Sequence, residues 1–204
     1  MNPSQRPIQI LTLRGKPAVA HLADLAQLRM AVFREFPYLY DGSLEYEMRY
    51  LSEYFESPNS ILILAKDTTF NTIVGASTAM PLKSADDVFL RAFHAVDINI
   101  DEVHYFGESV LLPEYRGHGI GHQFFGAREH AAQHDGFPIT TFCAVEREPD
   151  HPERPADHRP LDAFWKNRGY THHPQIRCSL DWKEPGSNRE TPHTLSFWIR
   201  DHRE

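Results

Sequence analysis

Three glycines between an apolar segment and an amphipathic one constrain this chain more than any other feature. Residues 110–112 are apolar and Pro113 begins a turn, after which come Gly117, Gly119 and Gly121. The apolar residues that follow recur at helical spacing: Phe124, Phe125, Ala127 and Ala131. Glycine lets an anionic group approach the backbone, and the first turn of a helix has unpaired N–H groups and a partial positive charge. The segment therefore predicts a strand, a turn and a helix N-terminus that bind a phosphate or pyrophosphate.

Two widespread phosphate motifs do not fit this segment. The dinucleotide-binding fingerprint is G-x-G-x-x-G, and after Gly117 and Gly119 its third glycine would stand where the chain has His122. A P-loop ends in Gly-Lys-Ser or Gly-Lys-Thr, and the chain has neither tripeptide. The pattern that remains is Arg116-x-x-Gly119-x-Gly121, preceded by Leu-x-Pro-Glu-Tyr at 111–115.

This pattern resembles the acyl-CoA pyrophosphate motif of the GNAT N-acetyltransferase superfamily, Arg/Gln-x-x-Gly-x-Gly/Ala. The resemblance implies an α/β fold with a central mixed sheet of about seven strands, splayed at a bulge and flanked by helices. It also implies acetyl-CoA as co-substrate, with its pyrophosphate on the amides from Gly117 to His122 and its acyl arm on the main chain of Leu111. The implied cofactor-binding residues of this region are Leu111, Leu112, Arg116, Gly117, His118, Gly119, Ile120, Gly121 and His122.

Composition sets outer limits on the class of protein. The 204 residues suffice for one domain, expected over 1–204, and no apolar run is long enough to span a bilayer. The first six residues lead to no signal-peptide core, and the two cysteines, Cys143 and Cys178, fit a reducing compartment, so we expect a cytoplasmic protein. A net charge of −7 argues against nucleic-acid binding. The 13 histidines show no metal-ligand spacing, so no metal is expected.

Hydrophobic periodicity predicts alternating strands and helices along the whole chain. The predicted strands are Ile8–Leu13, Ile61–Ala65, Thr72–Met80, Val103–Leu112, Ile139–Val145, Ile176–Trp182 and Thr194–Ile199. The predicted helices run from Pro17 to Phe36, from an N-cap at Ser43 to Phe55, over Asp86–Val96, from the glycine motif to a stop at Gly136, and over Leu161–Arg168. Residues 146–160 contain four prolines and many charges, which predicts a loop that is either a functional lid or a solvated excursion. This element order also resembles the GNAT fold.

Acetyl transfer to an amine needs a group that accepts the amine proton. Glu108 precedes the apolar run of its strand, and its neighbours Phe106 and Val110 would raise its pKa through desolvation. Tyr105, at a position where some GNAT proteins carry an acid/base residue, and Glu146, at the end of the next strand, are the alternative catalytic residues. The run 110–112 breaks strand alternation, which fits either a bulge or a strand buried on both faces.

The general acid and the acceptor pocket are less well marked. Many GNAT enzymes carry Asn-x-x-Ala-x-x-Leu-Tyr in the late helix, and this chain has His158 at the asparagine position and Trp165 at the tyrosine position. Both are implied cofactor contacts, but an indole does not give up its proton, so water, Tyr38 or Tyr40 would protonate the thiolate. The loop with Tyr38, Tyr40 and Asp41 stands where GNAT proteins bind the acceptor, although packing against the sheet is the alternative.

The sequence therefore favours an acetyl-CoA-dependent N-acetyltransferase that acts by direct transfer on an amine of a small molecule or peptide. We expect no nucleic-acid or membrane partner, and a homodimer is possible by analogy with the family. Because the usual tyrosine is replaced by Trp165, a catalytically silent acyl-CoA sensor is the first alternative. An unrelated nucleotide-binding α/β protein is the second.

Overall fold

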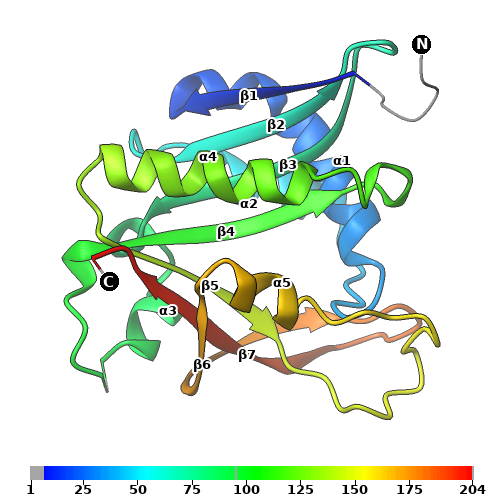
Figure 1. The fold of residues 1–204 in the computed structure, drawn as a ribbon. Coiled ribbons are helices and arrows are strands. Elements are labelled where there is room, and N and C mark those ends of the chain that lie inside the picture. The colour runs from blue at the N-terminus through cyan, green and yellow to red at the C-terminus, as the bar shows by residue number, and fades with distance from the viewer. Residues whose placement is uncertain (1–6, 95, 204) are drawn as a thin grey trace.

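Seven strands form one sheet in the order β1-β2-β3-β4-β5-β7-β6 (Figure 1). The computed structural model describes residues 7–94 and 96–203, so the expectation about the first six residues lies outside the described part. The strands are β1 Ile8–Arg14, β2 Ile61–Asp67, β3 Thr72–Pro81, β4 Val103–Leu111, β5 Ile139–Val145, β6 Thr171–Lys183 and β7 Glu190–Asp201. Neighbouring strands are antiparallel except β4 and β5, which are parallel. The predicted α/β class with a mixed, seven-stranded sheet is confirmed.

The helices begin and end largely where local signals place them. They are α1 Leu22–Phe33, α2 Leu44–Tyr54, α3 Asp87–Ala92, α4 Ile120–His134 and α5 Asp162–Asn167. The Ser43 side chain accepts a hydrogen bond from the Tyr46 amide at 3.3 Å, which confirms the predicted N-cap of α2. Gly136 adopts a left-handed conformation and the Phe137 amide donates to the Ala132 carbonyl, so α4 ends at the predicted glycine.

One predicted helix and the last two predicted strands have clearly different bounds. The helix expected from Pro17 to Phe36 is a 3-10 segment, Lys16–His21, followed by α1, which ends at Phe33. It ends early because the chain folds back and the Tyr40 amide donates to the Phe33 carbonyl at 2.7 Å. The last two strands extend beyond the predicted 176–182 and 194–199, because β6 and β7 pair with each other over most of their lengths and the irregularity between His173 and Arg177 interrupts the alternation of β6.

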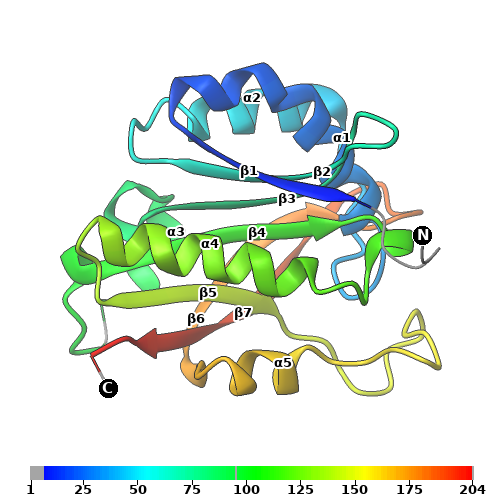
Figure 2. The ribbon, with the colours of Figure 1, turned by 45° about the horizontal axis from the view of Figure 1, so that its top comes forward.

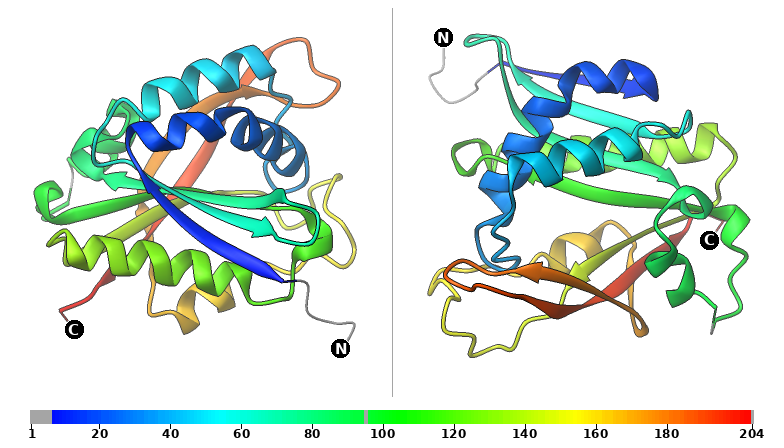
Figure 3. Two further views of the ribbon diagram at one scale, coloured as in Figure 1. Left: turned by 90° about the horizontal axis from the view of Figure 1, so that it is seen from above. Right: turned by 180° about the vertical axis from the view of Figure 1, so that it is seen from behind.

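Helices cover both faces of the sheet (Figures 2 and 3). Helices α1 and α2 pack on one face of the β1–β4 half, and α4 packs on the other. Helix α5 adds to the core on the α4 side, while α3 packs against β6 and its neighbours. Within the described residues, no helix is long and apolar enough to cross a bilayer.

The sheet opens between its two parallel strands. β4 and β5 pair only from Val103 to Tyr105 and from Ile139 to Thr141, and no pairing continues beyond these residues in the described chain. The longer remainder of β4 pairs only with β3, while β5 continues along β7. The parallel strands therefore enclose a gap that opens toward their carboxyl ends, which is the splay that the resemblance to the GNAT family implied.

The bulge lies elsewhere than the break in alternation suggested. From Ser77 to Ala79 of β3 the register advances two residues, while the facing residues of β4 advance three, from Ser109 to Phe106. The extra residue thus lies at Gly107–Glu108. The run 110–112 is regular in register and apolar because both faces are buried: Val110 packs in the α1–α2 core, and Leu111 packs against the core under α4. Of the two interpretations of this run, the strand buried on both faces is confirmed and a bulge within the run is excluded.

Candidate active site

The glycine loop before α4 leaves its main-chain donors free. Gly117 and Gly119 have φ angles of 79° and 80°, and a Cβ on either would meet no atom within 4 Å. Among the described residues, none of the amides from Gly117 to His122 donates to a backbone carbonyl, whereas Gln123 donates to Gly119. The loop therefore combines left-handed glycines, open space and unpaired amides at a helix N-terminus, which is the geometry that binds a phosphate.

Because main-chain groups alternate in direction along β4, those of one residue, Leu111, point into the gap. The Leu112 amide donates to the Val74 carbonyl of β3 at 3.0 Å. Because main-chain groups of successive strand residues point to opposite neighbours, those of Leu111 point away from β3, toward the gap. The Leu112 carbonyl accepts from the Tyr115 amide, so the main-chain groups of Leu112, a predicted cofactor contact, are already engaged.

The Arg116 side chain links the glycine loop to the end of β4 and to the segment after α1. Its Nε donates to the Leu111 carbonyl at 3.1 Å, and its Nη2 lies 2.8 Å from the Glu35 carboxylate after α1. These two contacts join the end of β4, the glycine loop and the region after α1. Arg116 thus fixes the shape of the loop, while the unpaired donors are the amides that follow it.

The other predicted residues of the motif divide by burial. The Ile120 side chain is in the core, so only its amide is available to a ligand. His118 and His122 are exposed. The His122 ring lies edge-on to Phe164 of α5, with 4.8 Å between ring centroids, and its Nδ1 is 3.3 Å from Arg168 Nη1.

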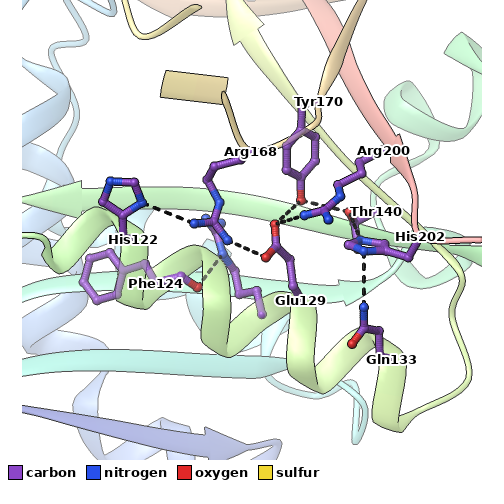
Figure 4. Close-up of polar contacts among 10 residues, drawn as sticks. His122, Phe124, Glu129, Gln133, Thr140, Arg168, Tyr170, Arg200 and His202 are labelled. Atoms are coloured by element: carbon purple, nitrogen blue, oxygen red, sulfur yellow. Dashed lines mark hydrogen bonds and ion pairs between the residues drawn. The ribbon is translucent and has the colours of Figure 1, made fainter. Parts of the chain in front are cut away.

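A buried carboxylate holds α5 and the end of the sheet against α4 (Figure 4). Glu129 of α4 accepts from Arg168, from Arg200 at 3.4 Å and from the Tyr170 hydroxyl at 3.2 Å. Beside this cluster is an open cavity of about 470 Å³, lined by His122, Asn167, Arg168, Gly169 and Arg200. The cavity thus begins at the first turn of α4 and carries two guanidinium groups.

Glu108, the first candidate base, is buried and belongs to the bulge of β4. Its Oε2 accepts from Arg29 Nη1 of α1 at 2.6 Å, and its amide donates to Thr78 Oγ1 at 3.3 Å. Its Oε1 is buried and has no hydrogen-bond partner among the described residues. Burial raises the pKa of Glu108, although the Arg29 charge opposes the shift. The structure therefore supplies a desolvated carboxylate, as the sequence predicted, and leaves one of its oxygens without a hydrogen bond.

The two alternative bases lie in different surroundings. Tyr105 is buried, stacks on Phe89 of α3 and lies 3.5 Å from Cys143 Sγ, and burial raises its pKa well above the usual value. Glu146 is partly exposed and accepts from Arg177 of β6 at 3.0 Å. Within the described residues, neither Tyr105 nor Glu146 forms a hydrogen bond or ion pair with Glu108, so these three residues do not form one cluster.

The loop between α1 and α2 connects the two halves of the sheet at the gap (Figure 3). The Tyr38 carbonyl accepts from Arg147 after β5 and from the Trp182 indole of β6, at 2.7 and 3.1 Å. Asp41 pairs with Arg34 and, at 3.0 Å, with Lys183. This loop therefore bounds the gap on the α1–α2 side.

Tyr40 of the same loop belongs to the surroundings of Glu108. Its hydroxyl donates to Glu47 Oε1 of α2 at 2.7 Å, and Glu47 Oε2 accepts from Arg29 Nε. Arg29 in turn holds Glu108. The structure thus brings the predicted Tyr40 and Glu108 together through two residues that sequence reasoning missed.

Arg29 and Glu47 could have been found in the sequence, because each is a charged residue within the apolar stripe of a predicted helix. Arg29 lies one turn after Leu25, and Glu47 one turn before Leu51, and both leucines are core residues. Charged side chains at such positions are rarely buried unless paired. Arg29 is 9% and Glu47 0% exposed.

His158 and Trp165, the implied cofactor contacts of the late helix, lie apart from each other in the structure. The His158 ring lies edge-on to Phe36 at 4.8 Å, so the 146–160 loop packs onto the α1–α2 loop. Trp165 packs between Phe142 and Trp198, with ring centroids 5.1 and 5.0 Å away. Across residues 7–94 and 96–203, no group of three or more His, Cys, Asp or Glu side chains is arranged to hold a metal.

Comparisons with known proteins bear on this geometry at the level of the fold. No protein-family model matches the sequence, and no curated protein matches it. A GNAT-family acetyltransferase of Staphylococcus aureus superposes with a TM-score of 0.57 at 12% identity, over 96% of this chain and 99% of that one. The chain has the GNAT fold.

Two further structures agree with this assignment. An acetyltransferase of Streptococcus agalactiae has a TM-score of 0.60 at 15% identity, over 97% of this chain and 99% of its own. The protein yncA of Salmonella typhimurium, solved with its cofactor acetyl-CoA, has a TM-score of 0.58 at 10% identity, over 96% and 95% of the two chains. At these identities the GNAT likeness concerns the fold alone.

Proposed function

We propose that this protein is an acetyl-CoA-dependent N-acetyltransferase that acts on an amine of a small molecule or peptide. The observation that carries the proposal is the set of unpaired amides from Gly117 to His122, in open space at the carboxyl end of the gap between β4 and β5. The diphosphate of acetyl-CoA would bind these amides, and its thioester would supply the activated acetyl group. The guanidinium groups of the cavity beside His122 suit a further anionic part of the same carrier.

The residues around the gap have separate roles in this proposal. The Leu111 main chain, directed into the gap, holds the acyl arm, and Arg116 keeps the glycine loop in shape. Glu108 accepts the amine proton at its free Oε1, either directly or through water. The loop with Tyr38, Tyr40 and Asp41 bounds the acceptor side. Trp165 is packed among aromatic rings and is no proton donor, so the leaving thiolate takes its proton from water or from the hydroxyl of Tyr38 or Tyr40.

Calorimetry and a thiol-release assay test the proposal together. We expect acetyl-CoA to bind with a micromolar dissociation constant, CoA to compete with it, and NAD and ATP not to compete. With a broad panel of amines, we expect amine-dependent release of CoA thiol. Binding without turnover on any amine would instead favour the acyl-CoA sensor, and absence of binding at high micromolar acetyl-CoA would refute both.

A further inference from the structure

Two buried carboxylates share a single guanidinium beneath the bulge of β4. Arg29 of α1 donates through Nε to Glu47 of α2 and through Nη1 to Glu108 of β4. Glu47 and Glu108 are 0% and 8% exposed. Charges in such surroundings interact more strongly than in water. The protonation of Glu108 therefore depends on how it shares Arg29 with Glu47.

The hydrogen bonds within this cluster are unequal. Both oxygens of Glu47 are engaged, one by Tyr40 and one by Arg29. Glu108 accepts from Arg29 at Oε2, and its buried Oε1 has no hydrogen-bond partner in the described structure, although the nearby Thr78 hydroxyl opposes the rise in the pKa of this carboxyl. Of the two carboxylates, Glu108 is thus the one with an oxygen that accepts no hydrogen bond in the described structure.

We propose that Arg29 and Glu47 are a positioning pair for Glu108. Arg29 holds the Glu108 carboxylate at the bulge with Oε1 free, and Glu47 draws part of the Arg29 charge away, which leaves Glu108 able to take up a proton. An exclusive Arg29–Glu108 pair would instead keep Glu108 ionised and weakly basic. The role in proton transfer rests on the proposed function, whereas the charge sharing itself does not.

Apart from Arg29 and Glu47, five residues face Glu108, and they do not set how the two carboxylates share the Arg29 charge. They are Tyr38 of the α1–α2 loop, Tyr50 and Tyr54 of α2, Thr78 of β3 and Arg128 of α4. Burial raises the pKa of each of the three tyrosines, so they stay neutral. Arg128 donates to the Glu108 main-chain carbonyl, and its guanidinium lies over the Phe106 and Phe125 rings.

Charge sharing predicts shifts of opposite sign in two variants. In Glu47→Gln the Arg29 charge serves Glu108 alone, so the titration midpoint of Glu108 moves to lower pH by roughly one unit. In Arg29→Gln the stabilising charge is lost and the midpoint moves to higher pH by about as much. A merely structural role would weaken the fold in both variants without this reversal. Arg29→Lys keeps the charge and restores part of the wild-type midpoint.

Carbon-13 NMR of protein labelled at the glutamate carboxyl carbons measures the midpoint without any cofactor or substrate. The Glu108 signal is the one absent in Glu108→Gln. The matched control is Arg34→Gln, because Arg34 is also an arginine of the α1 region but is 60% exposed in its side chain and pairs with Asp41. We expect the control to leave the Glu108 midpoint unchanged.

Shifts in the same direction, or no shift in either variant, would overturn the proposal. If a charge variant fails to fold by circular dichroism, Tyr40→Phe decides instead. Loss of the Tyr40 hydroxyl makes Glu47 compete more strongly for Arg29, so an upward shift of Glu108 supports the pair and an unchanged midpoint refutes it. Absence of acetyl transfer would refute the proposed function alone, since the titration needs no turnover.

Discussion

Tyr105 of β4 and Thr141 of β5 are the last residues that these two parallel strands pair. Two residues beyond Tyr105, the bulge at Gly107–Glu108 turns the Glu108 carboxylate toward α1. In the proposed function, the gap that would bind the acyl arm and the base that would accept the amine proton thus begin at the same point of β4. Changes at that point and at the glycine loop should have separable effects on binding, chemistry and stability.

Gly119→Val should lower the affinity for acetyl-CoA at least tenfold while leaving the protein folded. A valine at a φ of 80° is strained by about 1–2 kcal/mol, so the loop reorganises and its amides no longer converge. The core is untouched, because a Cβ at Gly119 meets no atom within 4 Å. Calorimetry measures the affinity and thermal unfolding the stability.

The matched control for the loop is Gly186→Val. Gly186 lies in the turn between β6 and β7, has a φ of 82° and also has no atom within 4 Å of a Cβ. It imposes the same backbone strain far along the chain from the glycine motif and should leave the affinity unchanged. Equal losses of acetyl-CoA affinity in the two variants would show that backbone strain in general, and not disruption of the glycine loop, weakens binding.

Glu108→Gln should reduce acetyl transfer by about 10²- to 10⁴-fold while acetyl-CoA still binds. In the wild type, kcat/KM should rise with pH as Glu108 loses its proton, and burial places this rise above the range of an ordinary carboxylate because it raises the pKa of Glu108. Glu146→Gln is the control, since Glu146 is paired with Arg177. A pH rise that disappears in Glu146→Gln but persists in Glu108→Gln would reverse the assignment.

The glycine loop and its unpaired amides were predictable from the sequence, while the surroundings of Glu108 were not. The conformation of Gly117, Gly119 and the first turn of α4 follows from local rules, because glycine is needed wherever φ is positive and helix amides are free wherever a helix begins. The pairing of Glu108 with Arg29 depends on how α1 and α2 pack on the sheet, and no local pattern records that contact.

The position of the bulge in β4 was not predictable for a related reason. Burial on both faces removes alternation from a strand just as a bulge does, so Val110 and Leu111 carried no information that separates the two. The better signal was Gly107, which lacks the side chain that would collide with Thr78 across the sheet.

Gly107→Ala should destabilise the protein by about 1–3 kcal/mol. A Cβ at Gly107 would lie 2.6 Å from Thr78 Oγ1, which is too close for any contact. In the double variant Gly107→Ala/Thr78→Ala this collision is absent, so urea unfolding should give a smaller loss than the two single losses added together. Gly126→Ala in α4 is the control: its Cβ meets no atom within 4 Å, and it should stabilise slightly. Strictly additive losses would place the strain elsewhere.

His104 should make the stability fall with pH in the mildly acidic range. Its side chain is fully buried, with both ring nitrogens unpartnered in the described structure, and burial lowers its pKa from 6.5 to about 4. Between these two values the unfolded chain binds a proton that the folded protein does not, so the free energy of unfolding decreases as pH falls from 6.5 toward 4. The loss over this window is about 3 kcal/mol.

His104→Phe isolates this contribution. The new ring would join Phe106 and Phe137, whose rings lie 6.1 and 5.1 Å from that of His104, and it cannot be protonated. Urea unfolding at pH 7.5 and pH 5 should therefore show a smaller loss of stability on acidification in the variant, by about 2 kcal/mol. Comparing the two pH values within each protein cancels any packing cost of the larger ring. The exposed His94→Phe should keep the wild-type pH dependence, and an equal reduction in both variants would mean that burial of His104 is not its source.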